Sequence, residues 1–286
     1  MRILVTGAKG QLGRALVSLL TPAHTVTAID IDQLNITDSA AVMAFFGQAQ
    51  PELVIHAAAL TQVDYCAENP DEALWVNGYG TRNIALACQT IDATLMHIST
   101  NEVFDGANIA VYHEYDRPNP INPYGYSKWV AEQMVRDLVA RHYIVRTSWL
   151  FAHGGRNFIH AILERAHNGQ SLRVVVNEVS TPTYARDLAG AMAQLLQTNL
   201  YGIYHLVSEG RSSRWDFARY VLDIAGHTNT PIERISSYEY PRASTPPEYA
   251  VLRNYAAARQ GIVLRHWKEA VRAFCEAEGL IPEGEA

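Results

Sequence analysis

The stretch Arg2-Ile-Leu-Val-Thr-Gly7-Ala-Lys-Gly10-Gln-Leu-Gly13 decides the fold of this 286-residue chain. It combines a short apolar strand, a turn with three glycines and the start of a helix that runs to Leu20. Gly7 permits a tight turn, Gly10 lets the backbone approach a pyrophosphate, and Gly13 lets helix and strand pack closely. The helix N-terminus also offers free N–H groups and a partial positive charge to phosphates. The G-x-x-G-x-x-G spacing is compatible with a purely structural turn, but its place at the start of the chain favours a dinucleotide site.

Strand-like and helical segments alternate through the first half of the chain. Strands are expected at 3–5, 25–29, 53–55, 94–98 and 143–146, and helices at 14–20, 38–46, 73–89 and 129–140. This alternation implies right-handed crossovers and a parallel sheet. We therefore expect an α/β protein with a Rossmann-type, doubly wound parallel sheet, whose dinucleotide-binding core covers residues 1–150.

Reactive side chains are expected at the carboxyl edge of this sheet, where open α/β sheets bind ligands. Thr100 follows the fourth expected strand, and its hydroxyl can donate to a substrate oxygen that gains negative charge. Tyr124 and Lys128 follow Pro123, which suits the first turn of a helix. Being four apart, they project from one face, and an ammonium beside a phenol makes an acid–base pair. A tyrosine and a lysine also fall four apart on ordinary solvated helices, so the pair alone is a weak motif.

The end of the second expected strand bears on the choice of cofactor. Asp30 stands where a carboxylate can accept hydrogen bonds from the adenosine ribose, which favours NAD over NADP. A turn or helix cap is an equally compatible interpretation. Ala58 and Ala59, after the third strand, leave space for a cofactor or pack the elements tightly. Lys9 and Arg14 are positioned to meet a 2′-phosphate, so both NADPH and NADH stay open.

Composition excludes several classes of protein. The formal net charge of −6 and the lack of a basic block argue against a nucleic-acid binder. Cys66, Cys88 and Cys275 have neither paired nor metal-type spacing, which is typical of reduced thiols. No apolar run has the length of a signal-peptide core or a membrane span. We therefore expect a soluble, cytoplasmic protein with no nucleic-acid and no membrane partner.

The second half of the chain is less regular. Helices are expected at 158–165, 186–196 and 265–278, and another near Trp215 with Ser213 as its cap. Strands are expected at 172–176 and 202–206. Residues 228–254, rich in proline, serine and aromatic residues, are expected to form a lobe with its loops, and the tail beyond Leu280 is expected to fray.

Taken together and in this order, the motifs resemble those of the extended short-chain dehydrogenase/reductase superfamily. The resemblance rests on the glycine turn, on Ser99-Thr100 and on Tyr124-x-x-x-Lys128. Within this superfamily the chain is similar to the dTDP-4-dehydrorhamnose reductases. The motifs that carry the similarity are Gly10-Gln-Leu-Gly13, Ser99-Thr-x-x-Val-Phe-Asp-Gly106, Asn122-x-Tyr-Gly-x-x-Lys128, Arg146-Thr-Ser-Trp149, Thr181-Pro-Thr183, Asp187-Leu-Ala189 and Gly202-Ile-Tyr-His205 followed by Trp215.

The resemblance implies reduction of the C4 ketone of dTDP-4-dehydro-L-rhamnose to dTDP-L-rhamnose by NADPH or NADH. Hydride passes from the nicotinamide to the carbonyl carbon while Tyr124 protonates the carbonyl oxygen. Lys128 is expected to lower the pKa of Tyr124 and to hold the nicotinamide ribose, and Thr100 to stabilise the developing alkoxide. Residues 151–286 are then mostly a smaller C-terminal lobe that binds the nucleotide-sugar substrate, with 183–206 returning to the core.

Residue by residue, the resemblance places cofactor contacts in the glycine turn, at the strand ends that follow it and on the catalytic helix. These contacts are expected from Gly7, Gly10, Gln11, Leu12, Gly13, Asp30, Asn35, Ile36, Ala58, Ala59, Tyr124 and Lys128. Substrate contacts are expected from Val63, Thr100, Glu102, Tyr124 and Trp149. The Trp149 indole offers a flat apolar face to the hexose, although core filling is an alternative.

Four positions depart from the family pattern. Glu102 stands where some members have an aromatic residue, and Thr245 where an arginine is frequent, so contacts to sugar or phosphate are expected to be rearranged. Asn35 replaces an aspartate near the adenine. Arg14-Ala15 replaces the glutamate through which some members bridge a dimer with a metal. We therefore expect no metal, and a monomer or a weak homodimer.

Two further hypotheses stay open. A related 4-ketoreductase that makes another nucleotide-linked 6-deoxyhexose would share all these motifs. A non-catalytic regulatory subunit that retains a dinucleotide site belongs to a different class of protein, and the intact Thr100, Tyr124 and Lys128 argue against it.

Overall fold

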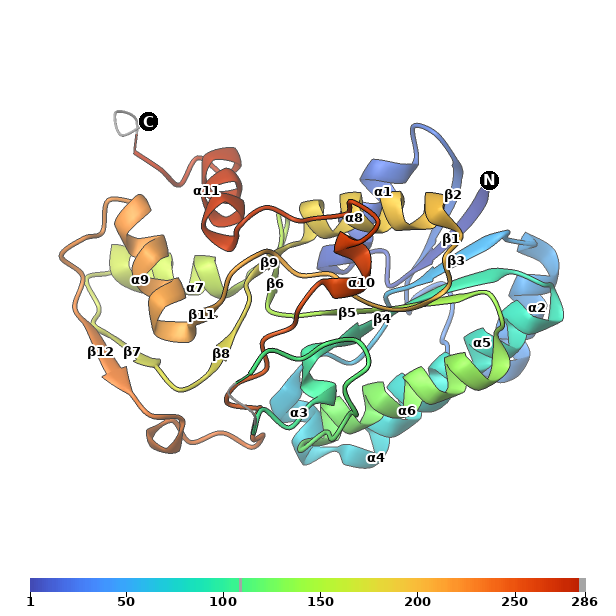
Figure 1. Ribbon diagram of the computed structural model, residues 1–286, viewed down its shortest axis with the longest axis horizontal. Helices are drawn as coiled ribbons and strands as arrows, with labels where there is room; N and C mark the ends of the chain where they lie inside the picture. Colours follow the sequence, from blue (N-terminus) through green and yellow to red (C-terminus); the bar gives the residue numbers. More distant parts are fainter. Residues whose placement is uncertain (108–109, 283–286) are drawn as a thin grey trace.

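The computed structural model describes residues 1–107 and 110–282. Its larger lobe is built on a six-stranded sheet in the order β10-β5-β4-β3-β1-β2, and every neighbouring pair is parallel (Figure 1). The strands are β1 (Arg2–Thr6), β2 (Thr25–Ile29), β3 (Leu53–His56), β4 (Thr94–Thr100), β5 (His142–Thr147) and β10 (Gly202–His205). The expected α/β class and Rossmann-type doubly wound sheet are confirmed.

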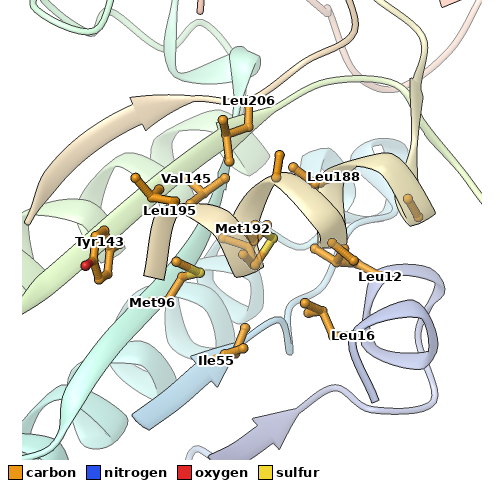
Figure 2. Close-up of a cluster of buried hydrophobic side chains, with 14 of the residues drawn as sticks. Leu12, Leu16, Ile55, Met96, Tyr143, Val145, Leu188, Met192, Leu195 and Leu206 are labelled. Atoms are coloured by element: carbon orange, nitrogen blue, oxygen red, sulfur yellow. The ribbon is translucent and has the colours of Figure 1, made fainter. Parts of the chain in front are cut away.

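Helices cover both faces of the sheet because successive strand residues point to opposite sides. Ile3 and Val5 are buried with α1 (Gln11–Leu20) and α8 (Ala185–Thr198) on one face. Leu4 between them is buried with α2 (Ser39–Ala49), α5 (Thr81–Thr90) and α6 (Pro123–Leu138) on the other. In Figure 2 the apolar side of α8 lies against α1 and the strands, through Leu188, Met192 and Leu195.

The connection between β3 and β4 is more broken than the single helix expected over 73–89. It consists of α3 (Val63–Glu68), α4 (Pro70–Ala73), a π-helix η1 (Leu74–Gly80) and α5. A Cβ at Gly80 would lie 2.8 Å from the Ile36 side chain, so the backbone here is pressed against the loop after β2. The wider π-helical turn, which propensity patterns do not distinguish from an α-helix, places Trp75 and Val76 in the wall of a cleft.

The smaller lobe has a core of its own. The helices α7 (Phe158–His167), α9 (Arg214–Ile224) and α11 (Trp267–Ala277) surround Phe151, Phe217 and Phe274. Strand β7 (Leu172–Val175) pairs in parallel with β12 (Ile232–Ile235), a strand that the sequence patterns did not predict within 228–254. A parallel two-stranded sheet joins β6 (Leu150–Phe151) to β9 (Thr183–Tyr184), and an antiparallel one joins β8 (Val179–Ser180) to β11 (Ser212–Ser213).

The chain crosses between the two lobes several times. Helix α8 and strand β10 lie in the larger lobe, as β10 pairs with β5. The segment with α10 (Tyr255–Ala258), Ile262 and Leu264 also packs into that core. The chain then returns to the smaller lobe, where Leu280 and Ile281 pack beside α11. The tail beyond Leu280 is the segment expected to fray. Its last part, residues 283–286, lies outside the described residues.

Within the described ranges, no helix combines the length and the apolar character that crossing a bilayer requires.

Candidate active site

A cleft of about 1010 Å³ runs along the carboxyl ends of the strands. The last residues of β1, β2 and β4 line it, as do the residues that follow β3 and β5. Every residue predicted to contact cofactor or substrate lines this cleft. They are Gly7, Gly10, Gln11, Leu12, Gly13, Asp30, Asn35, Ile36, Ala58, Ala59, Val63, Thr100, Glu102, Tyr124, Lys128 and Trp149. The structure thus brings these residues together, and the role of each stays a prediction.

Two positions of the glycine turn, Gly7 and Gly13, have no room for a side chain. Gly7 has a φ of +66°, and a Cβ there would lie 2.6 Å from the backbone nitrogen of Ala58. A Cβ at Gly13 would lie 2.1 Å from the Gly7 carbonyl oxygen, so helix α1 packs directly on the turn. Gly10 is the N-cap of helix α1. Because glycine has no side chain, it accepts no side-chain hydrogen bond from the first N–H groups of the helix. An open cradle of this kind at a helix N-terminus fits a pyrophosphate.

The loop after β2, the edge strand of the sheet, lines the same cleft as the predicted catalytic pair. The Asp30 carboxylate accepts hydrogen bonds from the backbone N–H groups of Lys9 and Ile31, both at 2.8 Å, so it ties this loop to the glycine turn. The Lys9 ammonium forms an ion pair with Asp32 at 2.7 Å. The Arg14 guanidinium donates to the backbone carbonyls of Lys9 and His153, away from the cleft lining. Of the two cations proposed for a 2′-phosphate, Lys9 alone lines the cleft.

The start of helix α6 positions the predicted catalytic residues. Asn122 caps the helix, accepting from the Gly125 N–H at 2.8 Å. A Cβ at Gly125 would lie 2.0 Å from the Glu102 carbonyl oxygen, so only glycine lets α6 rest on the turn η2 (Asn101–Val103). This contact holds Tyr124 beside Thr100, the last residue of β4. Lys128 follows one turn later on the same face and is 3% exposed.

A side pocket between the lobes adjoins the cleft at Glu102 and Trp149. It is lined from the larger lobe by Val63 and Glu102, and from the smaller lobe by Glu178, Arg214 and Arg242. Arg242 donates to the Glu178 carboxylate at 2.7 Å, and Arg214 lies 3.6 Å from the same carboxylate.

Trp149 lines both cavities, with its backbone at a φ of +41°. The Arg214 guanidinium lies 3.7 Å above its indole ring, as in a cation–π contact.

Comparison with known proteins agrees with this geometry. The family model of the RmlD substrate binding domain matches residues 1–279. The chain belongs to this family. It is 38% identical to the spore coat polysaccharide biosynthesis protein SpsK of Bacillus subtilis, over 96% of this chain and 97% of that protein.

Solved structures give the same result. A dTDP-4-dehydrorhamnose reductase from Clostridium acetobutylicum superposes with a TM-score of 0.95 at 36% identity, over 98% of this chain and 100% of that one. The Bacillus anthracis dTDP-4-dehydrorhamnose reductase, solved in complex with NADP, has a TM-score of 0.93 at 33% identity, over 96% and 99% of the two chains. The resemblance stated from the motifs is therefore confirmed.

Burial sets the protonation of the predicted catalytic pair, Tyr124 and Lys128, in this member of the RmlD family. Burial raises the pKa of Tyr124 above its usual value, the charge of Glu102 raises it further, and a hydrogen bond with Thr100 opposes the shift. Burial also lowers the pKa of Lys128 to about 7, against the attraction of Glu132. The pKa of Tyr124 thus lies above its usual value, although Lys128 was expected to lower it, and the individual effect of Lys128 on Tyr124 stays a prediction. Both shifts arise because removal from water disfavours the charged form of either group.

Beneath this pair lies a buried network that the motifs alone did not reveal. Glu132, one turn beyond Lys128 on α6, is 0% exposed. Its carboxylate accepts from the Ser99 hydroxyl at 2.6 Å and from two nitrogens of Arg146 at 2.9 and 2.7 Å. A paired, hydrogen-bonded carboxylate is the form in which a buried charge is tolerated. The repeat of polar residues at 124, 128 and 132 was the signal available in the sequence.

Arg214, Arg242 and Glu178 were also missed from the sequence. Their segments lie far apart along the chain and meet only in the folded smaller lobe. Arg242 comes from the same loop as Thr245, at which the expected cation is lacking. The loop thus places an arginine in the pocket, but at position 242, three residues before Thr245.

Proposed function

We propose that this protein reduces the C4 ketone of dTDP-4-dehydro-L-rhamnose to dTDP-L-rhamnose, with NADPH or NADH as the reductant. The observation that carries the proposal is the convergence of Thr100, Tyr124 and Lys128 in one cleft with the glycine turn. The chain's membership of the RmlD family and its similarity to dTDP-4-dehydrorhamnose reductases support it. The NADP found in the Bacillus anthracis relative supports a nicotinamide cofactor here.

The cleft has a place for each part of this cofactor. The turn from Gly7 to Gly13 would hold the pyrophosphate at the N-terminus of α1. The loop after β2, with Asp30, Asn35 and Ile36, would hold the adenosine, and Lys128 the nicotinamide ribose. When bound, the cofactor supplies a hydride to the carbonyl carbon of the sugar.

The side chains of this protein then stabilise the negative charge that develops on the carbonyl oxygen. The Tyr124 hydroxyl gives its proton to this oxygen, and its raised pKa keeps that proton in place until the oxygen becomes basic. The Thr100 hydroxyl donates a hydrogen bond to the same oxygen. Protonated Lys128, one turn away, stabilises the phenolate that Tyr124 becomes. Its pKa of about 7 lets it release and regain a proton near neutral pH.

We propose that residues 1–150 form the dinucleotide-binding core and that most of 151–286 forms the lobe that binds the sugar nucleotide. Val63, Glu102 and Trp149 are proposed to face the hexose, because they line both the cleft and the side pocket. With Arg214 over one face of the Trp149 indole, the opposite face is the surface proposed for the sugar ring.

The protein is proposed to act in the cytoplasm as a monomer or weak homodimer without a bridging metal. Its free, buried Cys66, Cys88 and Cys275 support a reducing compartment.

The direct test follows the absorbance of NADPH and of NADH on addition of dTDP-4-dehydro-L-rhamnose. We expect oxidation of at least one cofactor by the wild type, and a loss of about 100-fold or more in Tyr124→Phe. Tyr126→Phe is the matched control, since this exposed tyrosine lies two residues further along the same helix. Full turnover by Tyr124→Phe would contradict the assigned chemistry.

A second candidate is a 4-ketoreductase that acts on another nucleotide-linked 6-deoxyhexose. The carboxylate of Glu102 in the proposed sugar pocket favours it, because the family resemblance implies an aromatic residue there in some members. Turnover of a different dTDP-4-keto sugar at a higher kcat/KM would select this candidate.

A further inference from the structure

Glu102 places a carboxyl group where the substrate is proposed to react. It lies in η2, two residues after Thr100, and its backbone contacts the first turn of α6 at Gly125. It lines both the main cleft and the side pocket, and its charge acts on Tyr124. A ketone held by Thr100 and Tyr124 would therefore have this carboxyl group as a neighbour.

The Glu102 carboxylate is held in place by a neutral group. One oxygen accepts from the Asn122 amide at 2.7 Å, and that amide also donates to the Thr245 carbonyl at 3.2 Å. Among the described residues, no lysine, arginine or histidine forms an ion pair with Glu102, since the pocket arginines pair with Glu178. Within residues 1–107 and 110–282, no group donates a hydrogen bond to the second oxygen of the Glu102 carboxylate. This oxygen can therefore act on a ligand.

A carboxylate in this position has a specific chemistry available. A ketone makes the hydrogens on the two neighbouring carbons acidic, because the electron pair left behind spreads onto the carbonyl oxygen. Hydroxyl groups that donate to this oxygen stabilise the resulting enolate. Thr100 and Tyr124 are such donors. Their hydroxyl groups can donate hydrogen bonds to the oxygen of the enolate as well as to that of the alkoxide.

We propose that Glu102 is a general base that removes and returns a proton on a carbon next to the C4 ketone, so that the protein exchanges a substrate hydrogen with solvent in addition to reducing the ketone. This inference rests on the proposed function, since it needs a 4-keto sugar in the cleft. It names Glu102 as a further catalytic residue and gives its carboxylate a task that an aromatic residue at this position cannot perform.

The proposed step balances without a further reactant. The C–H bond breaks, its proton passes to the Glu102 oxygen, and its electron pair forms a C=C bond while the carbonyl π pair moves onto the C4 oxygen. The enolate oxygen is held by the Thr100 and Tyr124 hydroxyls. Return of a proton from the carboxyl group to carbon restores the ketone. Exchange of the carboxyl proton with water in between places a solvent hydrogen in the sugar.

The surroundings of Glu102 keep it suited to this task. Burial raises its pKa, and the nearby carboxylate of Glu178 adds to the rise. The hydrogen bond from Asn122 and the charges of Arg214 and Arg242 oppose the rise. A carboxyl group whose pKa moves toward neutrality is a more effective base at neutral pH than an exposed one.

The test is hydrogen exchange in D₂O with NADP⁺ in the site, so that no hydride is available. The substrate is dTDP-4-dehydro-L-rhamnose from which the enzymes that made it have been removed, and a sample without protein corrects for spontaneous exchange. NADPH is then added, and the mass of the reduced product reports the deuterium gained. We expect one added deuterium with the wild type, and a rate of exchange lower by about 100-fold or more in Glu102→Gln.

Two variants make the result specific. The Glu102→Gln substitution keeps the size of the side chain and an oxygen that can accept from Asn122, so we expect reduction to fall by less than about ten-fold. Glu72→Gln is the control, because Glu72 is an exposed cleft carboxylate that accepts from the Tyr65 hydroxyl, and it should leave both rates intact. Cofactor binding by each variant, measured by fluorescence titration, verifies the fold.

Reduction without deuterium gain in the wild type would overturn the role of Glu102 and leave the proposed function standing. Equal exchange in the wild type and Glu102→Gln would also overturn it. Absence of both exchange and reduction, with cofactor bound, would instead refute the proposed substrate.

Discussion

Lys128 illustrates how the surroundings of a single residue set its chemistry. Its side chain is 3% exposed, and the acidic Glu132 behind it is already engaged by Ser99 and Arg146. Burial therefore prevails over this attraction, and the pKa of Lys128 falls to about 7. A proton carrier that titrates near neutral pH fits the proposed transfer of a proton through Tyr124.

This lowered pKa predicts how stability depends on pH. The folded chain releases the Lys128 proton near pH 7, whereas the unfolded chain holds it until about pH 10.5. Between these values the unfolded state binds more protons, so the free energy of unfolding should rise with pH in this window. Urea unfolding at pH 7 and pH 9 measures the slope. Lys128→Met should reduce the slope and raise stability at pH 7, and an unchanged slope in the variant would refute the assignment.

Helix α1 shows how the packing of one element depends on a glycine, a residue without a side chain. It packs on the glycine turn so closely that a Cβ at Gly13 would lie 2.1 Å from the Gly7 carbonyl oxygen. Gly190, inside α8, is a contrasting case, as a Cβ there would meet no heavy atom of the described residues within 4 Å. Both glycines lie within helices, so the difference between them comes from packing.

We therefore expect opposite effects from the same substitution at these two sites. Gly13→Ala should lower the free energy of unfolding by about 1–3 kcal/mol and weaken NADPH binding, because α1 must move away from the turn. Gly190→Ala should raise it by about 0.5–1 kcal/mol, because alanine has the higher helix propensity. Thermal unfolding and a fluorescence titration with NADPH measure both effects. A destabilised Gly190→Ala, or a neutral Gly13→Ala, would contradict this account of the packing.

At the scale of the whole molecule, the two lobes share the proposed active site. The larger lobe contributes Thr100, Tyr124 and Lys128, while the smaller lobe places Arg214 and Arg242 around Glu178. The proposed substrate carries a diphosphate, and Arg214 and Arg242, both partly buried beside Glu178, are cations of the side pocket that can pair with it.

Arg242→Met should therefore weaken binding of the sugar nucleotide more than it slows the chemical step. We expect the KM for the sugar nucleotide to rise about ten-fold or more, with the KM for NADPH nearly unchanged. Steady-state kinetics with each substrate varied in turn measures the two constants. Arg173→Met is the control, since Arg173 pairs with Glu233 on the exposed outer surface of β7. A rise confined to kcat would place Arg242 outside the binding surface.

The amino-acid sequence by itself determined the order of the elements, the parallel sheet and the residues that line the cleft. These features depend on interactions over short distances along the chain. Short apolar runs such as Ile3-Leu-Val5 specify strands, Gly7 and Gly13 specify a turn with no side chain at these two positions, and the spacing of Tyr124 and Lys128 specifies one helix face. Each can be recognised because the local pattern and the final structure agree.

Only the tertiary structure decided the features that depend on burial and on distant segments. It placed the pKa of Tyr124 above its usual value rather than below it, because the amount of water removed from a side chain is a property of the packed protein. It paired β7 with β12 and brought Arg242 to Glu178, partners that are far apart along the chain. Such contacts form when loops close and cores pack. Neither process can be predicted from the local pattern of residues.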